Sequence, residues 1–248
     1  MIRLVCATQR SETEFWADTL LGRSLTFYRQ YAAKFELRLF PNNKTGLPKL
    51  YNQAIEEVRH VPRTLVFIHD DIHFFDMFWP ESIEAGLVEF DLIGTLGCKR
   101  HYPNQLSWVH VWTGEKVINP NREDVSGAVG HFASGEMEVA MNTIPAKPDH
   151  LSPFGARIYF SYFGPSGQKV VLLDGMLMAC KSQTLYESDI RFDETFDFHF
   201  YDMDLCRQFE KNSLRMGTWR VSVLHGSHGS YSKNFLKNYP DYVSKWSL

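Results

Sequence analysis

The feature of this chain of 248 residues that most restricts its fold is a regular alternation of apolar runs and helical patterns over the first hundred residues. Each run is short and ends abruptly in polar residues, as buried strands do. Parallel strands need crossover connections, which helices usually supply, so this order predicts an α/β three-layer sandwich with a mainly parallel central sheet. The expected strands are Ile2–Ala7, Phe35–Phe40, Thr64–Ile68 and Leu92–Leu96.

Helix signals fill the intervals between these strands. Ser11 followed by Glu14 is a capping-box pattern, and a first helix carrying Trp16, Leu20, Phe27 and Tyr31 on one face is expected to follow it. Gly46 precedes a second helical pattern, and Ile83–Val88 forms a third.

Residues 98–168 interrupt this alternation with irregular stretches rich in Gly, Pro, Asn, His and Trp. We expect a small antiparallel insertion there, within a single domain that spans residues 1–248. Regular patterns then return. They predict strands over Val170–Leu173, Met176–Ala179 and Thr218–Leu224, and a helix over Asp202–Phe209.

Charge and cysteine usage exclude several classes of protein. The formal net charge is −3 and the 26 Lys and Arg residues are scattered, so we expect no nucleic-acid partner. The absence of a secretory pattern and of any run of about 18 apolar residues predicts a cytoplasmic protein without a membrane span. Cys6, Cys98, Cys180 and Cys206 form no CxxC pair, which predicts reduced, mostly buried thiols.

Polar residues follow the first three expected strands. Ligands of open α/β sheets bind beyond the carboxyl ends of the strands, so these residues are expected at one edge of the sheet. Carboxylates after the apolar run Val66–Ile68 suit Mg²⁺ or Mn²⁺, although they also fit solvated loop or helix-capping aspartates. The residues are Thr8, Arg10, Asn42, Asn43, His69, Asp70 and Asp71.

A second acidic cluster leads into the predicted helix near residue 202. Carboxylates at a helix N-terminus are stabilised by the helix dipole, which accounts for Asp204 without any chemistry. Asp202 is expected just outside the helix, where it can project into a cleft and accept a proton from a hydroxyl group.

Taken together, these motifs resemble glycosyltransferase family 2, whose members have the A-type fold and transfer sugars from nucleotide donors. The resemblance runs from Thr8–Arg10 and Gly46–Asn52 through Phe67–Asp71 to Asp174–Met176, Phe192–Leu205 and His225. Two departures are present. His69 stands where relatives carry the first acid of Asp-x-Asp, and Tyr201 stands where relatives often carry Glu before the catalytic Asp.

The resemblance implies a role for each matching position. Asp71, with His69 and His225, would hold Mn²⁺ or Mg²⁺, and Asp202 would be the base of an inverting single displacement; His228 is a weaker ligand candidate. Asp174 and Gly175 would face the acceptor, and the donor-side residues would be Thr8, Arg10, Asn42, Asn43, Asn52 and Asp70. The donor would be a nucleotide-diphosphate sugar of UDP or GDP type, as in polysaccharide biosynthesis. Residues 1–97 would form the nucleotide-binding half, and residues 169–248 the acceptor and catalytic half.

Two other functions stay open. A sugar nucleotidyltransferase would usually carry a Gly-rich phosphate loop, but Thr8–Glu12 contains no glycine. The loss of one acid at His69 also fits a carbohydrate-binding or assembly subunit without activity. The aromatic residues of the insertion fit an acceptor surface, a subunit contact in an oligomer, or a small satellite core; they include Trp108, His110, Trp112 and Phe132.

Overall fold

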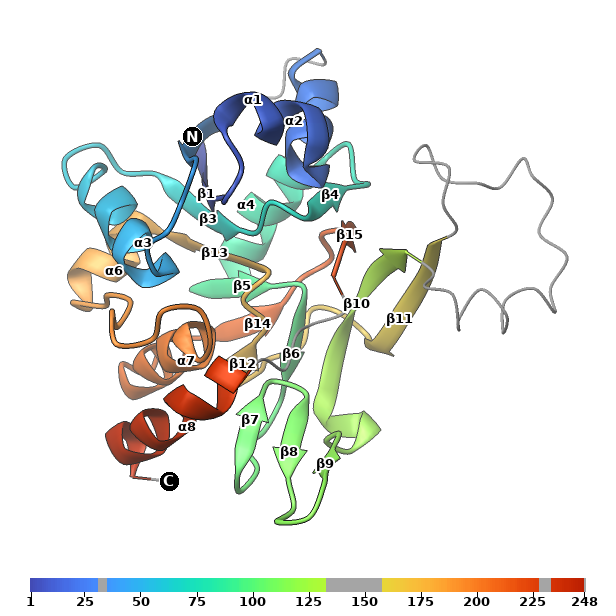
Figure 1. Ribbon diagram of the computed structural model, residues 1–248, viewed down its shortest axis with the longest axis vertical. Helices are drawn as coiled ribbons and strands as arrows, with labels where there is room; N and C mark the ends of the chain where they lie inside the picture. The colour runs from blue at the N-terminus through green and yellow to red at the C-terminus, as the bar shows by residue number, and fades with distance from the viewer. Residues whose placement is uncertain (31–34, 133–157, 228–232, 248) are drawn as a thin grey trace, which may run out of the picture.

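The computed structural model describes residues 1–30, 35–132, 158–227 and 233–247, and its main sheet has six strands (Figure 1). Five of these strands run in the same direction, and only β13 runs against its neighbours. The predicted α/β fold with a mainly parallel sheet is therefore confirmed. The spatial order is β14 (Met216–Thr218), β5 (Leu92–Gly94), β13 (Leu177–Lys181), β3 (Thr64–Ile68), β1 (Ile2–Ala7) and β2 (Phe35–Phe40).

A second sheet lies beside the main one, and a small antiparallel sheet projects from it at the bottom of Figure 1. The second sheet has the order β12 (Leu172–Leu173), β6 (Leu96–Cys98), β10 (Val125–Phe132), β15 (Val223–His225) and β4 (Ile72–Phe74), with β11 (Ile158–Gly164) also paired to β10. The small sheet contains β7 (Gln105–Ser107), β8 (His110–Trp112) and β9 (Val117–Ile118). The antiparallel strands expected in residues 98–168 are thus present, and β10 is built into the middle of the second sheet.

In its described part the chain passes between the two large sheets without an intervening helix at four places: from β3 to β4, β5 to β6, β12 to β13 and β14 to β15. His69–Asp71 forms the first of these crossings, and Asp174–Met176 forms the third. The polar residues of these two motifs therefore lie where the two sheets meet, a boundary here called the seam.

These crossings correct two strand predictions. The sequence predicts one strand over Leu92–Leu96, but the chain leaves the main sheet after Gly94 and enters the second sheet at Leu96. Likewise, the strand predicted over Thr218–Leu224 is divided between β14 and β15. Apolar residues are buried in both sheets, so a continuous apolar run gives no sign that the chain has changed sheets.

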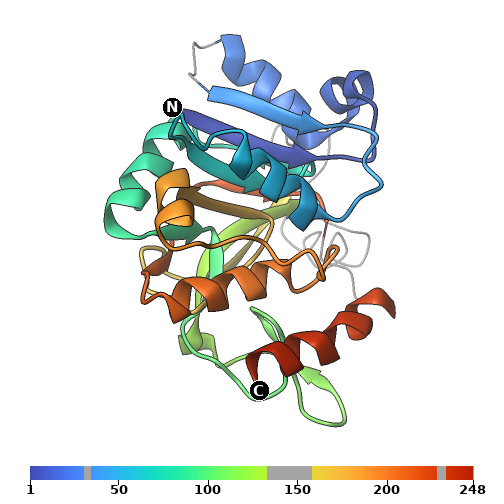
Figure 2. The ribbon, with the colours of Figure 1, turned by 90° about the vertical axis from the view of Figure 1, so that its left-hand side faces the viewer.

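Helices cover the sheets, and α1, α3 and α7 begin at or within one residue of the predicted positions, whereas α4 begins at Trp79, four residues before the predicted Ile83. Gly46 is the N-cap of α3, and Pro48 occupies its first turn, where a missing N–H costs nothing. In Figure 2, α7 and α8 (orange and red) lie one below the other under the main sheet. The helices are α1 (Glu12–Asp18), α2 (Leu20–Gln30), α3 (Leu47–Glu56), α4 (Trp79–Glu89), α6 (Ser182–Glu187), α7 (Tyr201–Lys211) and α8 (Lys233–Trp246).

The predicted first helix is in fact two helices. Ser11 and Glu14 form the expected capping box of α1. At Thr19 the backbone becomes extended, and the Thr19 hydroxyl donates to the carbonyl of Phe15 at 2.7 Å and accepts from the N–H of Gly22 at 3.0 Å. This side chain competes with the helical backbone for hydrogen bonds, a common reason for a break at threonine. Tyr31, predicted on the same helix face, lies outside the described residues.

An ion pair between the buried Asp204 and Lys245 attaches α8 to α7. Asp204 is fully buried in the first turn of α7, as expected for a carboxylate at a helix N-terminus. Its carboxylate accepts from Lys245 at 2.6 Å and from the indole N–H of Trp246 at 2.9 Å. Asp202 lies in the same turn, so the prediction that it stands outside the helix is wrong. The capping residue is Phe200, in left-handed conformation with φ of 70°.

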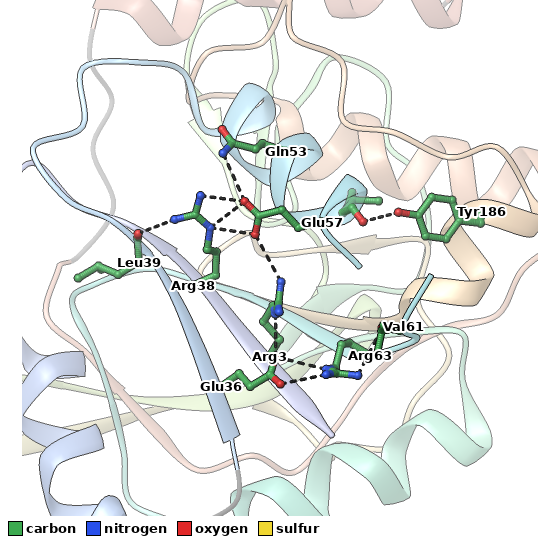
Figure 3. A network of polar contacts seen from close by, with 10 residues as sticks. Arg3, Glu36, Arg38, Leu39, Gln53, Glu57, Val61, Arg63 and Tyr186 are labelled. Atoms are coloured by element: carbon green, nitrogen blue, oxygen red, sulfur yellow. Dashed lines mark hydrogen bonds and ion pairs between the residues drawn. The ribbon is translucent and has the colours of Figure 1, made fainter. Parts of the chain in front are cut away.

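A network of arginines and glutamates ties β1 and β2 to the end of α3, on the outer part of the main sheet (Figure 3). Arg3 and Arg63 donate to Glu36 at 2.9 and 3.0 Å, and Arg38 donates to Glu57 at 2.8 Å. Such half-exposed pairs contribute only about 0.2–1 kcal/mol each, so their main effect is to fix the register of this edge.

The structure also bears on the predictions for the cysteines and for membrane-spanning helices. The four cysteines are unpaired and buried, as predicted. Among the residues that the structure describes, no helix has the length and apolar character needed to cross a bilayer.

Candidate active site

A cavity of about 730 Å³ lies along the seam, here called the seam cavity. Both large sheets and the segment before α7 contribute to its wall. The site residues predicted from the sequence that line it are His69, Asp70, Asp71, Asp174, Gly175, Asp202 and His225. Residues that are far apart in the sequence therefore meet at one place, because the crossings between the sheets bring them together.

Three of these residues form a cluster that suits a metal ion. The potential ligand atoms of His69, Asp71 and His225 all lie within 4.8 Å of one another. The cluster is held by backbone pairing, since His225 is the cross-strand neighbour of Ile72 and the N–H of Gly226 donates to the carbonyl of Asp71 at 2.8 Å. Two imidazoles and a carboxylate suit a transition-metal ion, and Mn²⁺ accepts imidazole ligands more readily than Mg²⁺, which prefers oxygen.

The carboxylate of Asp71 has one oxygen available for a cation. Its Oδ2 lies 3.5 Å from Nε2 of His225, while its Oδ1 is buried and has no hydrogen-bond partner among the described residues. Burial alone would raise the pKa of Asp71, but the hydrogen bond and charge of His225, with a smaller effect of the neighbouring imidazole of His69, lower it to about 2. An ionised, buried carboxylate with an unsatisfied oxygen fits a cation well.

Tyr201 fixes the ring of His69. The Tyr201 hydroxyl donates to the carbonyl of Gly175 at 3.0 Å and lies 2.9 Å from Nε2 of His69. Because the single phenolic hydrogen is used by Gly175, Nε2 has to carry the hydrogen of the imidazole, and the lone pair is left on Nδ1. Burial also lowers the pKa of His69, which keeps the ring neutral and able to bind a metal.

The same cavity also contains a pair of aspartates, Asp174 and Asp202. Asp202 accepts hydrogen bonds from the backbone N–H groups of Gly175 at 3.1 Å and of Met203 at 2.9 Å. Burial first, and then the charge of Asp174, raise the pKa of Asp202 to about 7. A carboxylate with this pKa can take up a proton near neutral pH.

Aromatic side chains complete the cavity, and the small antiparallel sheet supplies one that touches the acidic pair. The indole N–H of Trp108 donates to Asp174 at 2.5 Å, and its ring meets Phe163 edge to face at 5.0 Å. Phe198 is 52% exposed and stacks on the ring of His69 at 5.9 Å. His110 also lines the cavity, whereas Trp112 is exposed on β8.

In the part of the chain that the structure describes, most of the residues predicted to bind the donor do not line the cavity. The Thr8 hydroxyl donates at 2.5 Å to Asp70, which lines the cavity, and the backbone N–H of Asn43 donates to the carbonyl of Thr8 at 2.8 Å. Thr8 and Asn43 therefore lie behind the cavity wall. Asn42 makes the same kind of backbone contact with Arg10 and has φ of 52°, as turn residues often do. Neither of these two lines the cavity within the described ranges.

Asn52 has a structural role. Its side-chain amide both donates to the carbonyl of Phe192 and accepts from its N–H, each at 2.9 Å, and so imitates a strand partner. It does not line the cavity as the described residues define it. Asparagine in a helix gives no sequence sign of such a distant partner.

Tyr201, His131 and Tyr159 line the cavity without having been predicted as site residues. The sequence marks Tyr201 only as a departure from a motif, and His131 and Tyr159 follow no pattern in the sequence that points to a site. His228 and the side chain of Phe132 fall outside what the structure describes.

Comparison with known proteins gives a likeness in fold. No protein-family model matches the chain, and no curated protein matches it in sequence. The crystal structure of GalNAc-T7 with UDP, GalNAc and Mn²⁺ is 11% identical over 98% of this chain and 48% of that chain, with a TM-score of 0.49. The crystal structure of S. aureus TarS is 11% identical over 98% of this chain and 39% of that chain, with a TM-score of 0.45. A structure of TarS 1–349 has a TM-score of 0.38.

The chain spans about half the length of these matched chains, between 39% and 57%. The first two matches cover nearly the whole of this chain, at 98% each. At these identities the likeness concerns the fold alone, so the function has to be sought in the chain's own residues.

Proposed function

We propose that this protein is a glycosyltransferase that transfers a sugar from a nucleotide-diphosphate donor to a hydroxyl acceptor, with inversion and with the help of a divalent cation. The observation that supports this most is the content of the seam cavity. The same cavity is lined by a cluster that can hold a cation and by a carboxylate that can accept a proton. The cluster is His69, Asp71 and His225, and the carboxylate is Asp202.

In this proposal Asp202 is the base. Its carboxylate is oriented by the N–H groups of Gly175 and Met203, and its pKa of about 7 allows it to accept the proton of the acceptor hydroxyl near neutral pH. A general base contributes roughly 10²–10⁴-fold to the rate. Asp174 lies beside it, with Trp108 and Met176 N–H bonded to its two oxygens, and would contact the acceptor sugar together with Gly175.

The donor would bind at the other part of the cavity. His69, Asp71 and His225 would hold Mn²⁺, or less favourably Mg²⁺, which would offset the negative charge of the diphosphate. Asp70 lies next to this cluster and would contact the nucleoside part, with Thr8, Arg10, Asn42 and Asn43 supporting it from behind. Residues 1–97 then act as the nucleotide-binding half and residues 169–248 as the catalytic half.

Calorimetry and a donor-hydrolysis assay test the proposal. The protein should bind Mn²⁺, then UDP or GDP more tightly in its presence, and should release nucleoside diphosphate slowly from at least one nucleotide sugar. Binding without turnover over a panel of donors and acceptors would instead favour a non-catalytic binding subunit, the alternative that the histidine at position 69 allows. Absence of any nucleotide binding would overturn the proposal.

A further inference from the structure

The wall of the seam cavity has an unusual charge for a site that takes a diphosphate. Four aspartates line it, Asp70, Asp71, Asp174 and Asp202, and no Lys or Arg does so in the described part of the chain. A diphosphate needs hydrogen-bond donors and positive charge, which proteins commonly supply with Lys or Arg. Among the described residues, the basic side chains on this wall are all histidines: His69, His110, His131, His199 and His225.

His131 lies next to the cluster of His69, Asp71 and His225 without belonging to it. In the second sheet, His131 of β10 is the cross-strand neighbour of His225 of β15 on one side and of Tyr159 of β11 on the other. Cross-strand neighbours point to the same face of a sheet. Accordingly, the His131 ring lies 5.9 Å from the His225 ring and 5.5 Å from the Tyr159 ring, between ring centroids, and all three line the cavity.

This position is within reach of a group bound to the cation. A phosphate oxygen that shares a cation with His225 would lie within a few ångströms of that ring, since the bonds from the ion to both atoms are each only about 2.0–2.2 Å. The neighbouring ring of His131 would then face the same phosphate. An imidazole with one N–H can donate to it whether or not the ring is charged.

We infer that His131 donates a hydrogen bond to the diphosphate of the donor, and that it does the work that Lys or Arg would do on a more basic wall. This inference rests on the proposed function. His131 would be a catalytic residue without being a metal ligand, and it would contact the phosphate both in the bound donor and as the leaving group departs.

Calorimetry on the full chain separates these roles, with Mn²⁺ alone and then UDP or GDP in the presence of Mn²⁺ as probes. His131→Ala should leave the Mn²⁺ affinity within about twofold and reduce the nucleotide affinity about tenfold, as expected for losing a hydrogen bond to a charged group. His131→Gln, which retains an N–H donor, should recover most of that loss. His110→Ala is the matched control, because His110 lines the same cavity and bonds Ser107 at 2.8 Å; its nucleotide affinity should match the parent protein.

Three results would overturn the inference. Equal nucleotide affinity in His131→Ala and the parent protein would show that the side chain makes no contact with the phosphate. Loss of Mn²⁺ binding in His131→Ala, with an unchanged thermal midpoint, would make it a metal ligand instead. An equal loss in His131→Gln and His131→Ala would remove the hydrogen bond as the cause. If the parent protein binds Mn²⁺ but neither nucleotide, the proposed function fails, and the contact fails with it.

Discussion

Two aspartates of the seam cavity show how one residue type acquires opposite properties. Asp71 and Asp202 both lose water through burial, which by itself raises the pKa of each carboxyl group. Next to Asp71 stand the imidazoles of His225 and His69, and its pKa falls to about 2. Next to Asp202 stands another aspartate, Asp174, and its pKa rises to about 7.

The difference between the two pKa values suits Asp71 to binding a cation and Asp202 to accepting a proton. A carboxylate that is ionised at every ordinary pH, with an unsatisfied oxygen, suits a permanent cation. A carboxylate that titrates near neutrality suits a proton that comes and goes. Burial is the first cause of the raised pKa of Asp202, and the neighbours decide whether the effect of burial is reinforced, as at Asp202, or reversed, as at Asp71.

The largest expected effect comes from replacing the base. Asp202→Asn should lower kcat by about 10²–10⁴-fold, because the amide cannot accept the proton, while Mn²⁺ and nucleotide affinities stay unchanged. The amide oxygen can still accept from Gly175, so the fold should persist. Steady-state kinetics and calorimetry on the same sample check this. Turnover within threefold of the parent protein would remove Asp202 as the base.

The same variant has a stability signature. The pKa of Asp202 is raised from 3.8 to about 7 in the folded protein, so its contribution to stability is fully present below about pH 4 and is lost as the pH rises to about 7. Asp202→Asn lacks this loss. Its thermal midpoint, measured against that of the parent protein, should therefore gain as the pH rises from 4 to 8; a constant difference would contradict the raised pKa.

Replacing the other aspartate should act on the cation. Asp71→Asn removes the only carboxylate of the His69, Asp71 and His225 cluster, and should weaken Mn²⁺ binding by about 100-fold. Calorimetric titration with Mn²⁺ measures this. Asp204→Asn is unsuitable as a control because Asp204 is buried in the fold, so Asp76→Asn serves instead, at a partly exposed position in the loop before α4. Equal Mn²⁺ affinity in Asp71→Asn and Asp76→Asn would move the cation site elsewhere.

A smaller effect is expected from Tyr201→Phe. Without the hydroxyl, the ring of His69 is no longer held with its lone pair on Nδ1, and Mn²⁺ affinity should fall about tenfold, at the low end of the range for groups that orient a ligand. Tyr242→Phe is the matched control, since this buried tyrosine accepts from Arg207 outside the cavity. If both variants keep the parent affinity, Tyr201 does not orient His69.

The finest test concerns the interaction between Asp174 and Asp202. If Asp202 is the base, kcat should rise with pH, with a midpoint near 7, because only the ionised form accepts a proton. Asp174→Asn removes a neighbouring negative charge, lowers the pKa of Asp202, and should move this midpoint down by roughly one pH unit. The pH dependence of kcat in both proteins gives the answer, and an unmoved midpoint would mean that burial alone sets the pKa.

Much of the fold could be predicted from sequence because local patterns report it. The runs of β1, β2 and β3, the capping box at Ser11 and the start of α3 after Gly46 all depend on neighbours in the chain. The crossings at Thr95 and after Thr218 could not, because an apolar residue looks alike in either sheet.

The candidate site divides in the same way. Asp71 and Asp202 stand out as acids beside apolar runs, so the sequence predicts them directly. Tyr201, Trp108 and His131 act through contacts made by distant segments: Tyr201 with His69, Trp108 with Asp174, and His131 with His225. No local spacing carries this information. Asn52 is the opposite case: it stands at a motif position, but its side chain hydrogen-bonds the backbone of Phe192 and does not line the cavity as the described residues define it.

Diffraction from a crystal soaked with Mn²⁺ and UDP, collected at a wavelength where manganese scatters anomalously, would locate the cation in the seam cavity. We expect one anomalous peak in contact with Asp71, His69 and His225, with the diphosphate on the same ion and the carboxylate of Asp202 not bonded to it. A peak between Asp174 and Asp202, or no peak in the seam cavity, would contradict this expectation.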